Sequence, residues 1–147
     1  MKRKCLLKVQ VWVHYKTKDG TRYVLLLKTK KSRGGFWQPV TGCVESGETV
    51  DFAAFREAQE ETCMGLAGQP KRTGYSFTFR GKRGLTREYV FEARPGKYDY
   101  SVRVSPHEHQ AAKFVKPEEA LGMLKFESNA EALRRLMNKW RKNPRLK

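Results

Sequence analysis

Glu57, Glu60 and Glu61 are the residues whose type and spacing most clearly suggest chemistry. Successive residues of a helix are about 100° apart around its axis, so these three carboxylates would share one face. Like charges this close repel one another and weaken a helix. A divalent cation such as Mg²⁺ compensates the repulsion, because it takes oxygen ligands and bridges carboxylates to substrate phosphates. A solvated acidic helix face is the alternative, and the three residues alone do not decide between the two.

Charge is distributed unevenly along the chain. The formal net charge is +16, from 31 Lys and Arg against 15 Asp and Glu. Six of the acidic residues fall between Glu45 and Glu61, where Arg56 is the only basic residue. A compact acidic island attracts divalent cations, and a basic surface attracts polyanions over long range. Charge alone does not name the ligand, since scattered basic residues also serve general solubility.

A longer motif surrounds the three glutamates. Five residues separate Gly42 from Glu48, and seven more separate Glu48 from Arg56-Glu57-Ala58-Gln59-Glu60-Glu61. This arrangement resembles the Nudix box, G-x5-E-x7-R-E-U-x-E-E-x-G-U, in which U is an apolar residue. By this resemblance the chain is identified as a member of the Nudix hydrolase family.

The chain departs from the box at one position. Cys63 replaces the second glycine, while Met64 supplies the final apolar residue. A glycine at this point usually allows a left-handed helix stop, and we expect Gly65 to take that role two residues later. Because the glutamates precede the change, the metal site should be little affected.

The resemblance implies a Mg²⁺-dependent hydrolase, with Mn²⁺ as a substitute, that cuts a phosphoanhydride bond in a nucleotide-type substrate. Glu48 and Arg56 would pair to hold the loop against the helix. An acid from a later loop serves as general base in some members, and Glu108 resembles it; the alternative is an exposed loop acid. His107 and His109 are expected at the loop surface rather than at a metal. The catalytic candidates are therefore Glu57, Glu60, Glu61, Glu108 and Arg56, and the expected metal ligands are Glu57, Glu60, Glu61 and a backbone carbonyl near Thr41 or Gly42.

The elements that must position these residues follow from periodicity and turn signals. Residues 7–15 alternate as in a strand, the apolar run 23–27 predicts a strand buried on both faces, and residues 50–64 predict a helix. On that helix Phe52, Phe55, Ala58 and Thr62 should face the core. A hairpin with a basic tip is expected over 75–93, followed by strands over 98–104 and 112–115. A helix is expected over 117–124. A C-terminal amphipathic helix follows, with Ser128 and Glu131 as its capping box.

These elements predict one α/β or α+β domain spanning residues 1–147, and the resemblance implies a mixed β-sheet sandwiched between helices. No apolar run is long enough to cross a membrane, and no secretory signal is visible. Three widely spaced cysteines fit neither a disulfide framework nor a zinc site, so a cytoplasmic location is expected. Dimers are frequent in the family, and a homodimer is compatible with the sequence.

The substrate is predicted less directly. Trp37-Gln38 resembles a segment of enzymes acting on free nucleotide or dihydroneopterin triphosphates, but also of RNA pyrophosphohydrolases. Trp37 would either stack on a base or pack in the core. The expected substrate-binding residues are Trp37, Gln38, Lys30, Arg33 and Arg87, within a basic rim of Lys28, Lys30, Lys31, Arg33, Arg80, Lys82, Arg83 and Arg87.

A broad basic rim suits the phosphate chain of an RNA 5′ end better than a free nucleotide. The leading hypothesis is therefore an RNA 5′-triphosphate pyrophosphohydrolase that also accepts free (d)NTPs such as GTP and dGTP. A housekeeping nucleoside or dihydroneopterin triphosphate pyrophosphatase is the alternative enzyme. A non-catalytic, basic RNA-binding Nudix module is the alternative from another class.

Overall fold

The computed structural model describes residues 6–96, 102–104 and 106–145. Within these residues a seven-stranded sheet is accompanied by three α-helices and one short 3-10 helix, η1 (Lys31–Arg33). The strands are β1 (Leu7–Lys16), β2 (Arg22–Thr29), β3 (Trp37–Gln38), β4 (Val40–Cys43), β5 (Lys71–Gly81), β6 (Gly84–Ala93) and β7 (His109–Val115). The helices are α1 (Val50–Thr62), α2 (Pro117–Met123) and α3 (Glu127–Lys142).

The sheet is built around β1. The first part of β1 pairs parallel with β6 and antiparallel with β4, and its last residues pair antiparallel with β2. β5 extends the sheet beyond β6, while β3 and β7 both pair with β2. The predicted strands in residues 7–15 and 23–27 are confirmed, as is the hairpin with a basic tip, formed by β5 and β6 around Lys82 and Arg83. The sheet is therefore mixed, as expected.

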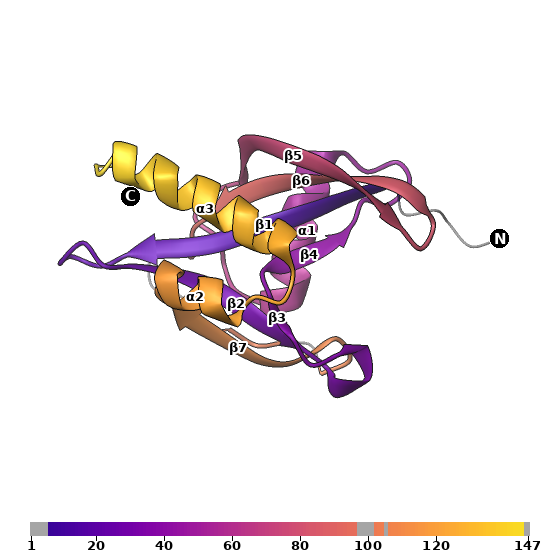
Figure 1. The fold of residues 1–147 in the computed structure, drawn as a ribbon, viewed down its shortest axis with the longest axis horizontal. Coiled ribbons are helices and arrows are strands. Elements are labelled where there is room, and N and C mark those ends of the chain that lie inside the picture. Colours follow the sequence, from indigo (N-terminus) through magenta and orange to yellow (C-terminus); the bar gives the residue numbers. More distant parts are fainter. Residues whose placement is uncertain (1–5, 97–101, 105, 146–147) are drawn as a thin grey trace.

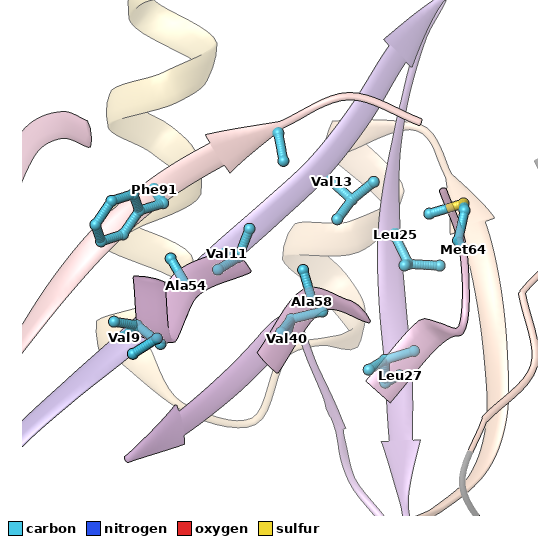
Figure 2. Close-up of a cluster of buried hydrophobic side chains, with 12 residues drawn as sticks. Val9, Val11, Val13, Leu25, Leu27, Val40, Ala54, Ala58, Met64 and Phe91 are labelled. Atoms are coloured by element: carbon cyan, nitrogen blue, oxygen red, sulfur yellow. The ribbon is translucent and has the colours of Figure 1, made fainter. Parts of the chain in front are cut away.

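Helices cover both faces of this sheet, with α1 on one side and α2 and α3 on the other (Figure 1). Val9, Val11 and Val13 of β1 pack with Ala54 and Ala58 of α1 in the core cluster of Figure 2. Residues of β2 belong to the hydrophobic clusters on both faces of the sheet. The prediction that this strand is buried on both faces is therefore confirmed. The expected sandwich of a sheet between helices is present.

The second face of β1 is buried although its residues are partly polar. Gln10 and His14 are almost inaccessible there, beneath the α3 side of the sheet. The Trp12 indole Nε1 donates to Gln10 Oε1 at 2.6 Å, and Gln10 Nε2 donates to Glu88 Oε2 at 2.6 Å. Burial is tolerated because these polar groups are hydrogen-bonded to one another.

The face by which α1 docks is the expected one only in part, because Ala58 and Thr62 are fully buried and Phe52 is not. Phe52 is 55% exposed, whereas Ala53, Ala54 and Ala58 are fully buried. Small alanine side chains let the helix backbone approach β1 and β4 closely, and close packing outweighs the hydrophobicity of one large side chain. The same rotation buries Glu61. The acidic side of α1 therefore lies partly against the sheet.

The remaining expectations are met in part. The helices α2 and α3 are confirmed, but the capping box is wrong: α3 begins at Glu127, and Ser128 lies inside its first turn. Phe126, which precedes α3, packs edge-on against Phe36 with ring centroids 5.0 Å apart. This apolar contact holds the entry to α3 in place of a polar cap.

The strands predicted over 98–104 and 112–115 differ from those of the structure. Of the strand expected over 98–104, residues 98–101 lie outside the described residues, and residues 102–104 are not in a strand. The last strand, β7, begins at His109 rather than at Ala112. Among the described residues, no helix is both long and apolar enough to cross a bilayer.

Candidate active site

The box residues are carried by β4, the loop after it and α1. Thr49 caps the start of α1 by accepting a hydrogen bond from the Phe52 N–H at 3.0 Å. At the other end Cys63 has a φ of +51°, and its N–H donates to the Gln59 carbonyl at 2.8 Å. Cys63 therefore takes the left-handed conformation itself. The expectation that Gly65 would supply this stop is wrong, because α1 already ends at Cys63, the box position itself.

Gly42 brings β4 and α1 into close contact. A Cβ atom added to Gly42 would lie 2.0 Å from the Glu57 carboxyl carbon and 2.3 Å from its Oε1. Such distances are impossible for a real side chain, so only glycine fits beside the present position of Glu57. The sequence places Gly42 fifteen residues from Glu57, and the structure brings the two into contact.

Arg56 ties the loop to the helix. Its Nε and Nη2 donate to the two oxygens of Glu48 at 2.6 and 3.0 Å, and Nη2 also donates to the Cys43 carbonyl at 2.9 Å. The hydrogen bonds from Arg56 lower the pKa of Glu48 below its usual value, although some burial opposes the shift. This two-point geometry holds the residues between Glu48 and Arg56 in one arrangement.

The same guanidinium orients two of the three glutamates. Arg56 Nη1 donates to Glu57 Oε1 at 2.9 Å and to Glu60 Oε2 at 3.1 Å. The two acceptors differ in environment, because the Glu60 side chain is 60% exposed and that of Glu57 only 13%. Glu57 therefore lies within the site, while Glu60 lies at its rim.

Glu61 is the most deeply buried of the three. Burial raises its pKa well above the usual value, and the nearby carboxylates of Glu57 and Glu108 act in the same direction. Burial also raises the pKa of Glu57, with hydrogen bonds to Glu61 and Arg56 opposing the change. Two carboxylates in contact in a poorly solvated place cannot both be ionised without a compensating positive charge.

A second chain segment completes this cluster. One ligand atom from each of Glu61, Glu108 and His109 lies within 4.8 Å of the others. His109 Nε2 is 3.5 Å from Glu61 Oε1, and both side chains are almost fully buried. His109 was expected at the loop surface; that expectation is wrong, because His109 begins β7 and pairs with Thr29. His107, in contrast, is exposed as expected.

His109 is thus the site residue that sequence reasoning missed. Its only sequence signal was adjacency to Glu108, since a single histidine in a loop does not reveal its burial. Two buried atoms of this cluster, Glu61 Oε2 and His109 Nδ1, have no hydrogen-bond partner among the described residues. Unpaired buried polar atoms are costly, so they indicate a missing ligand or ordered water.

This donor set fits a hard divalent cation. It offers carboxylate oxygens from Glu61 and Glu108 beside the His109 imidazole, Glu57 is hydrogen-bonded to Glu61, and one Glu61 oxygen is unpaired among the described residues. A cation would also offset the mutual repulsion that burial imposes on these groups.

The expected substrate-binding residues are divided between two parts of the sheet. Lys30 and Arg33 flank the cluster. The Lys30 N–H donates to the Glu108 carbonyl at 3.3 Å, and the positive charge of Arg33 is near enough to lower the pKa of His109, which burial lowers first. Trp37 and Gln38 form β3 and are half-buried, with Trp37 packed against the core on the α3 side. Arg87 is exposed on β6 and donates to Ser76 Oγ at 3.1 Å, so the structure does not bring it beside Lys30.

The family follows from a comparison with known sequences. Residues 7–138 match the family described as the NUDIX domain, which is nearly the whole described chain. The chain belongs to the Nudix family. Its Nudix box is accordingly the segment from Gly42 to Met64, and the arrangement of Gly42, Glu57 and Arg56 described above is that of the box in this protein.

Individual relatives match shorter parts of their own chains. An octanoyltransferase of Myxococcus xanthus is 34% identical over 119 residues, which are 76% of this chain and 31% of that protein. A dihydroneopterin triphosphate diphosphatase of Escherichia coli is 43% identical over 49 residues, 33% of this chain and 32% of that protein. This chain therefore spans about a third of the length of these curated relatives.

A solved structure matches over a larger share. An Ap4A hydrolase of Caenorhabditis elegans, crystallised as a binary complex, has a TM-score of 0.78 and 23% identity, covering 93% of this chain and 98% of that chain. This likeness establishes a Nudix-type fold for the present chain, in agreement with the mixed sheet between helices.

Proposed function

We propose that this protein is a Mg²⁺-dependent hydrolase that cuts a phosphoanhydride bond of a nucleotide-type triphosphate. The observation that supports this proposal is the buried Glu61, which lies beside Glu57, Glu108 and His109 and keeps one carboxylate oxygen unpaired. Without a cation the buried carboxylates repel one another. A divalent metal ion would remove this repulsion and could bind a substrate phosphate at the same time.

The residues that would hold Mg²⁺, or Mn²⁺ in its place, are Glu57, Glu60 and Glu61 together with the backbone carbonyl of Gly42. When bound, such an ion acts as a Lewis acid that polarises a phosphoryl oxygen and activates water. Glu60 would join the others by a rotation of its exposed side chain, since its present contact is with Arg56 at the surface. Arg56 keeps Glu57 in place and Glu48 keeps Arg56 in place.

Glu108 is our candidate for the general base. Its carboxylate lies in the same group as Glu61 and is half-buried, so it can accept a proton from an attacking water near the cluster. Lys30 and Arg33 flank this position and would neutralise charge on the substrate phosphates.

For the substrate we propose the 5′-triphosphate end of RNA, with free (d)NTPs such as GTP and dGTP also accepted. The support is the net charge of +16 and the basic residues of the η1 loop beside the cluster. Dihydroneopterin triphosphate is the second candidate, because the chain is 43% identical to the Escherichia coli diphosphatase over 49 residues. A basic RNA-binding module without catalysis is the third, and intact box glutamates argue against it.

The test is product identification with each candidate substrate in Mg²⁺. We expect pyrophosphate from 5′-triphosphorylated RNA, with a rate that falls as salt rises, and slower release from GTP and dGTP. Salt-insensitive cleavage of free nucleotides or of dihydroneopterin triphosphate alone would refute the RNA substrate. Loss of all turnover in Glu61→Gln, with the fold intact by circular dichroism, separates an enzyme from a binding module.

A further inference from the structure

Two cavities open beside the last turns of α3, the first where β1 leads into β2 and the second at the end of β6. The first has a volume of about 450 Å³ and is lined by the basic residues Lys16, Arg22, Lys116 and Arg141. The second has a volume of about 410 Å³ and is lined by the basic residues Lys71, Arg94, Lys139 and Arg145. We call them the α3 cavities. Neither is lined by a residue of the Nudix box.

The α3 cavities carry far more positive than negative charge. The eight basic residues face two carboxylates, one from Glu118 in the first cavity and one from Glu92 in the second. Glu92 is already bound to His14 and Lys139. Arg94, Lys116 and Arg141 are exposed and make no ion pair with the residues that the structure describes. Most of this positive charge is therefore left for a ligand.

The two cavities form one electrostatic unit. Arg22 in the first donates from Nη1 to His14 Nδ1, 2.9 Å away, and His14 lines the second. Burial lowers the pKa of both Arg22 and His14; Glu92 opposes the change in each, and the charge of Arg94 adds to it. The guanidinium groups of Arg22 and Arg94 therefore repel each other, and a further anion beside them would relieve that repulsion.

We propose that the α3 cavities bind the phosphodiester backbone of single-stranded nucleic acid. A row of cations around the end of a helix matches a chain of phosphates, whereas a small anion would fill only one cavity. A flexible strand can bend around α3, but a duplex is stiff over this length. Trp140 is only 7% exposed and stacks under the Arg22 guanidinium, so it offers no surface for bases and binding should not depend on sequence.

An anionic membrane is a poorer match for this surface. Membrane binding needs exposed apolar side chains beside the basic ones. The exposed large hydrophobic residues of the described chain all lie outside the α3 cavities: they are Leu6, Leu7, Phe52, Leu85 and Phe126.

The first of the α3 cavities lies well away from the acidic cluster. His109 begins β7, and Lys116 directly follows the end of that strand. At about 3.3 Å per residue these two residues are roughly 23 Å apart along the strand. A stacked strand with a rise of about 3.4 Å would span that distance in roughly seven nucleotides. The inference goes beyond the proposed function, because backbone binding here does not require cleavage.

The test measures binding of a fluorescent 20-nucleotide single strand with a 5′-hydroxyl end, which has no triphosphate to cleave. Anisotropy titrations across a salt series would compare the wild type with the triple variant Arg94→Ala, Lys116→Ala, Arg141→Ala. The matched control removes three exposed basic residues outside the cavities, in Arg103→Ala, Lys113→Ala, Lys125→Ala. We expect at least a tenfold loss of affinity in the first variant, and a salt slope lower by about 2, at roughly 0.7 per phosphate contact.

The control variant should lose less than threefold, and Arg94→Lys with Arg141→Lys should bind like the wild type. Equal losses in both triple variants, or no loss in the first, would overturn the inference. So would retention of the chain on vesicles of 30% phosphatidylserine that depends on the same residues while the oligonucleotide fails to bind. Turnover of 5′-triphosphorylated RNA and of GTP is measured in parallel, and the absence of both activities from the wild type would refute the proposed function without affecting the binding result.

Discussion

Glu61 shows how one buried carboxylate organises the candidate site. Its neighbours come from two separate parts of the chain: Glu57 on α1 itself, and the adjacent residues Glu108 and His109 at the start of β7. The box motif predicts the first of these neighbours and the family resemblance suggests the second. The contact with His109 depends on how β7 pairs with β2, which no local pattern in the sequence reveals.

Gly42 allows a test at the residue scale. We expect Gly42→Ala to lower turnover at least tenfold and to raise the Mg²⁺ concentration needed, because the new methyl group would displace the Glu57 carboxylate. The overpacking should also cost about 1–3 kcal/mol of unfolding free energy. Steady-state kinetics across Mg²⁺ concentrations and urea unfolding measure the two effects.

Gly122→Ala in α2 is the matched control, since a Cβ atom there would meet nothing within 4 Å. It should leave kinetics unchanged and increase stability slightly, because alanine is the better helix former. Wild-type turnover and Mg²⁺ dependence in Gly42→Ala would contradict the role given to this glycine.

At the scale of elements, the position of α1 is set by the residues at its two ends and by its buried alanines. Thr49 starts it, Cys63 ends it, and the alanines allow it to approach the sheet. The start of the helix follows from the sequence. Its rotation does not, because a helical wheel scores hydrophobicity and the packing against β1 and β4 selects small side chains.

Cys63 provides the test for this element. A non-glycine residue in the left-handed region costs about 1–2 kcal/mol, and Cys63 is exposed, so its side chain contributes little packing in return. We expect Cys63→Gly to increase the unfolding free energy by about 0.5–1 kcal/mol in urea titrations. The increase is smaller than the strain because glycine also raises the conformational entropy of the unfolded chain. Cys63→Ala keeps the strained backbone and should match the wild type; a gain as large as that of glycine would disprove the strain.

At the scale of the whole molecule, a polar network joins the sheet to the C-terminal helix. His14 of β1 and Lys139 of α3 both hydrogen-bond to Glu92 of β6. Burial raises the pKa of Glu92, but these hydrogen bonds outweigh it and lower the pKa to about 2. Because Arg22 donates to Nδ1 of His14, the imidazole is neutral and carries its proton on Nε2.

This network predicts a pH dependence of stability. The folded pKa of Glu92 lies below its ordinary value of 4.5, so its contribution is present above about pH 4.5 and is lost as pH falls towards 2. Burial lowers the pKa of His14 below 6.5, so protonation of His14 also destabilises the fold as pH falls below 6.5. We expect Glu92→Gln to cost about 2 kcal/mol at pH 7 and to flatten the loss of stability between pH 4.5 and 2.

Thermal unfolding from pH 2 to 7 measures this difference. Glu127→Gln, which removes an exposed partner of Arg134, is the control and should change the curve little. If Glu92→Gln follows the wild-type curve through the acid range, the network does not stabilise the molecule in the way proposed.

Much about this protein follows from local sequence. Alternating and continuous apolar segments predict β1, β2, the β5–β6 hairpin and α3, because strand and helix periods are set by backbone geometry. The spacing from Gly42 to Glu61 predicts the box, because the length of the loop fixes where Gly42 and Glu48 lie relative to the residues of the helix. These are properties of segments that interact mainly with themselves.

Tertiary structure alone decided the rest. It buried His109 and Glu61 together, exposed Phe52, made Cys63 rather than Gly65 the end of α1, and gathered basic residues from β1, β2, β5, α3 and their connections around the α3 cavities. Each of these outcomes depends on which distant segments meet and how closely. Such contacts are set by packing and desolvation across the whole fold, and no single stretch of the chain encodes them.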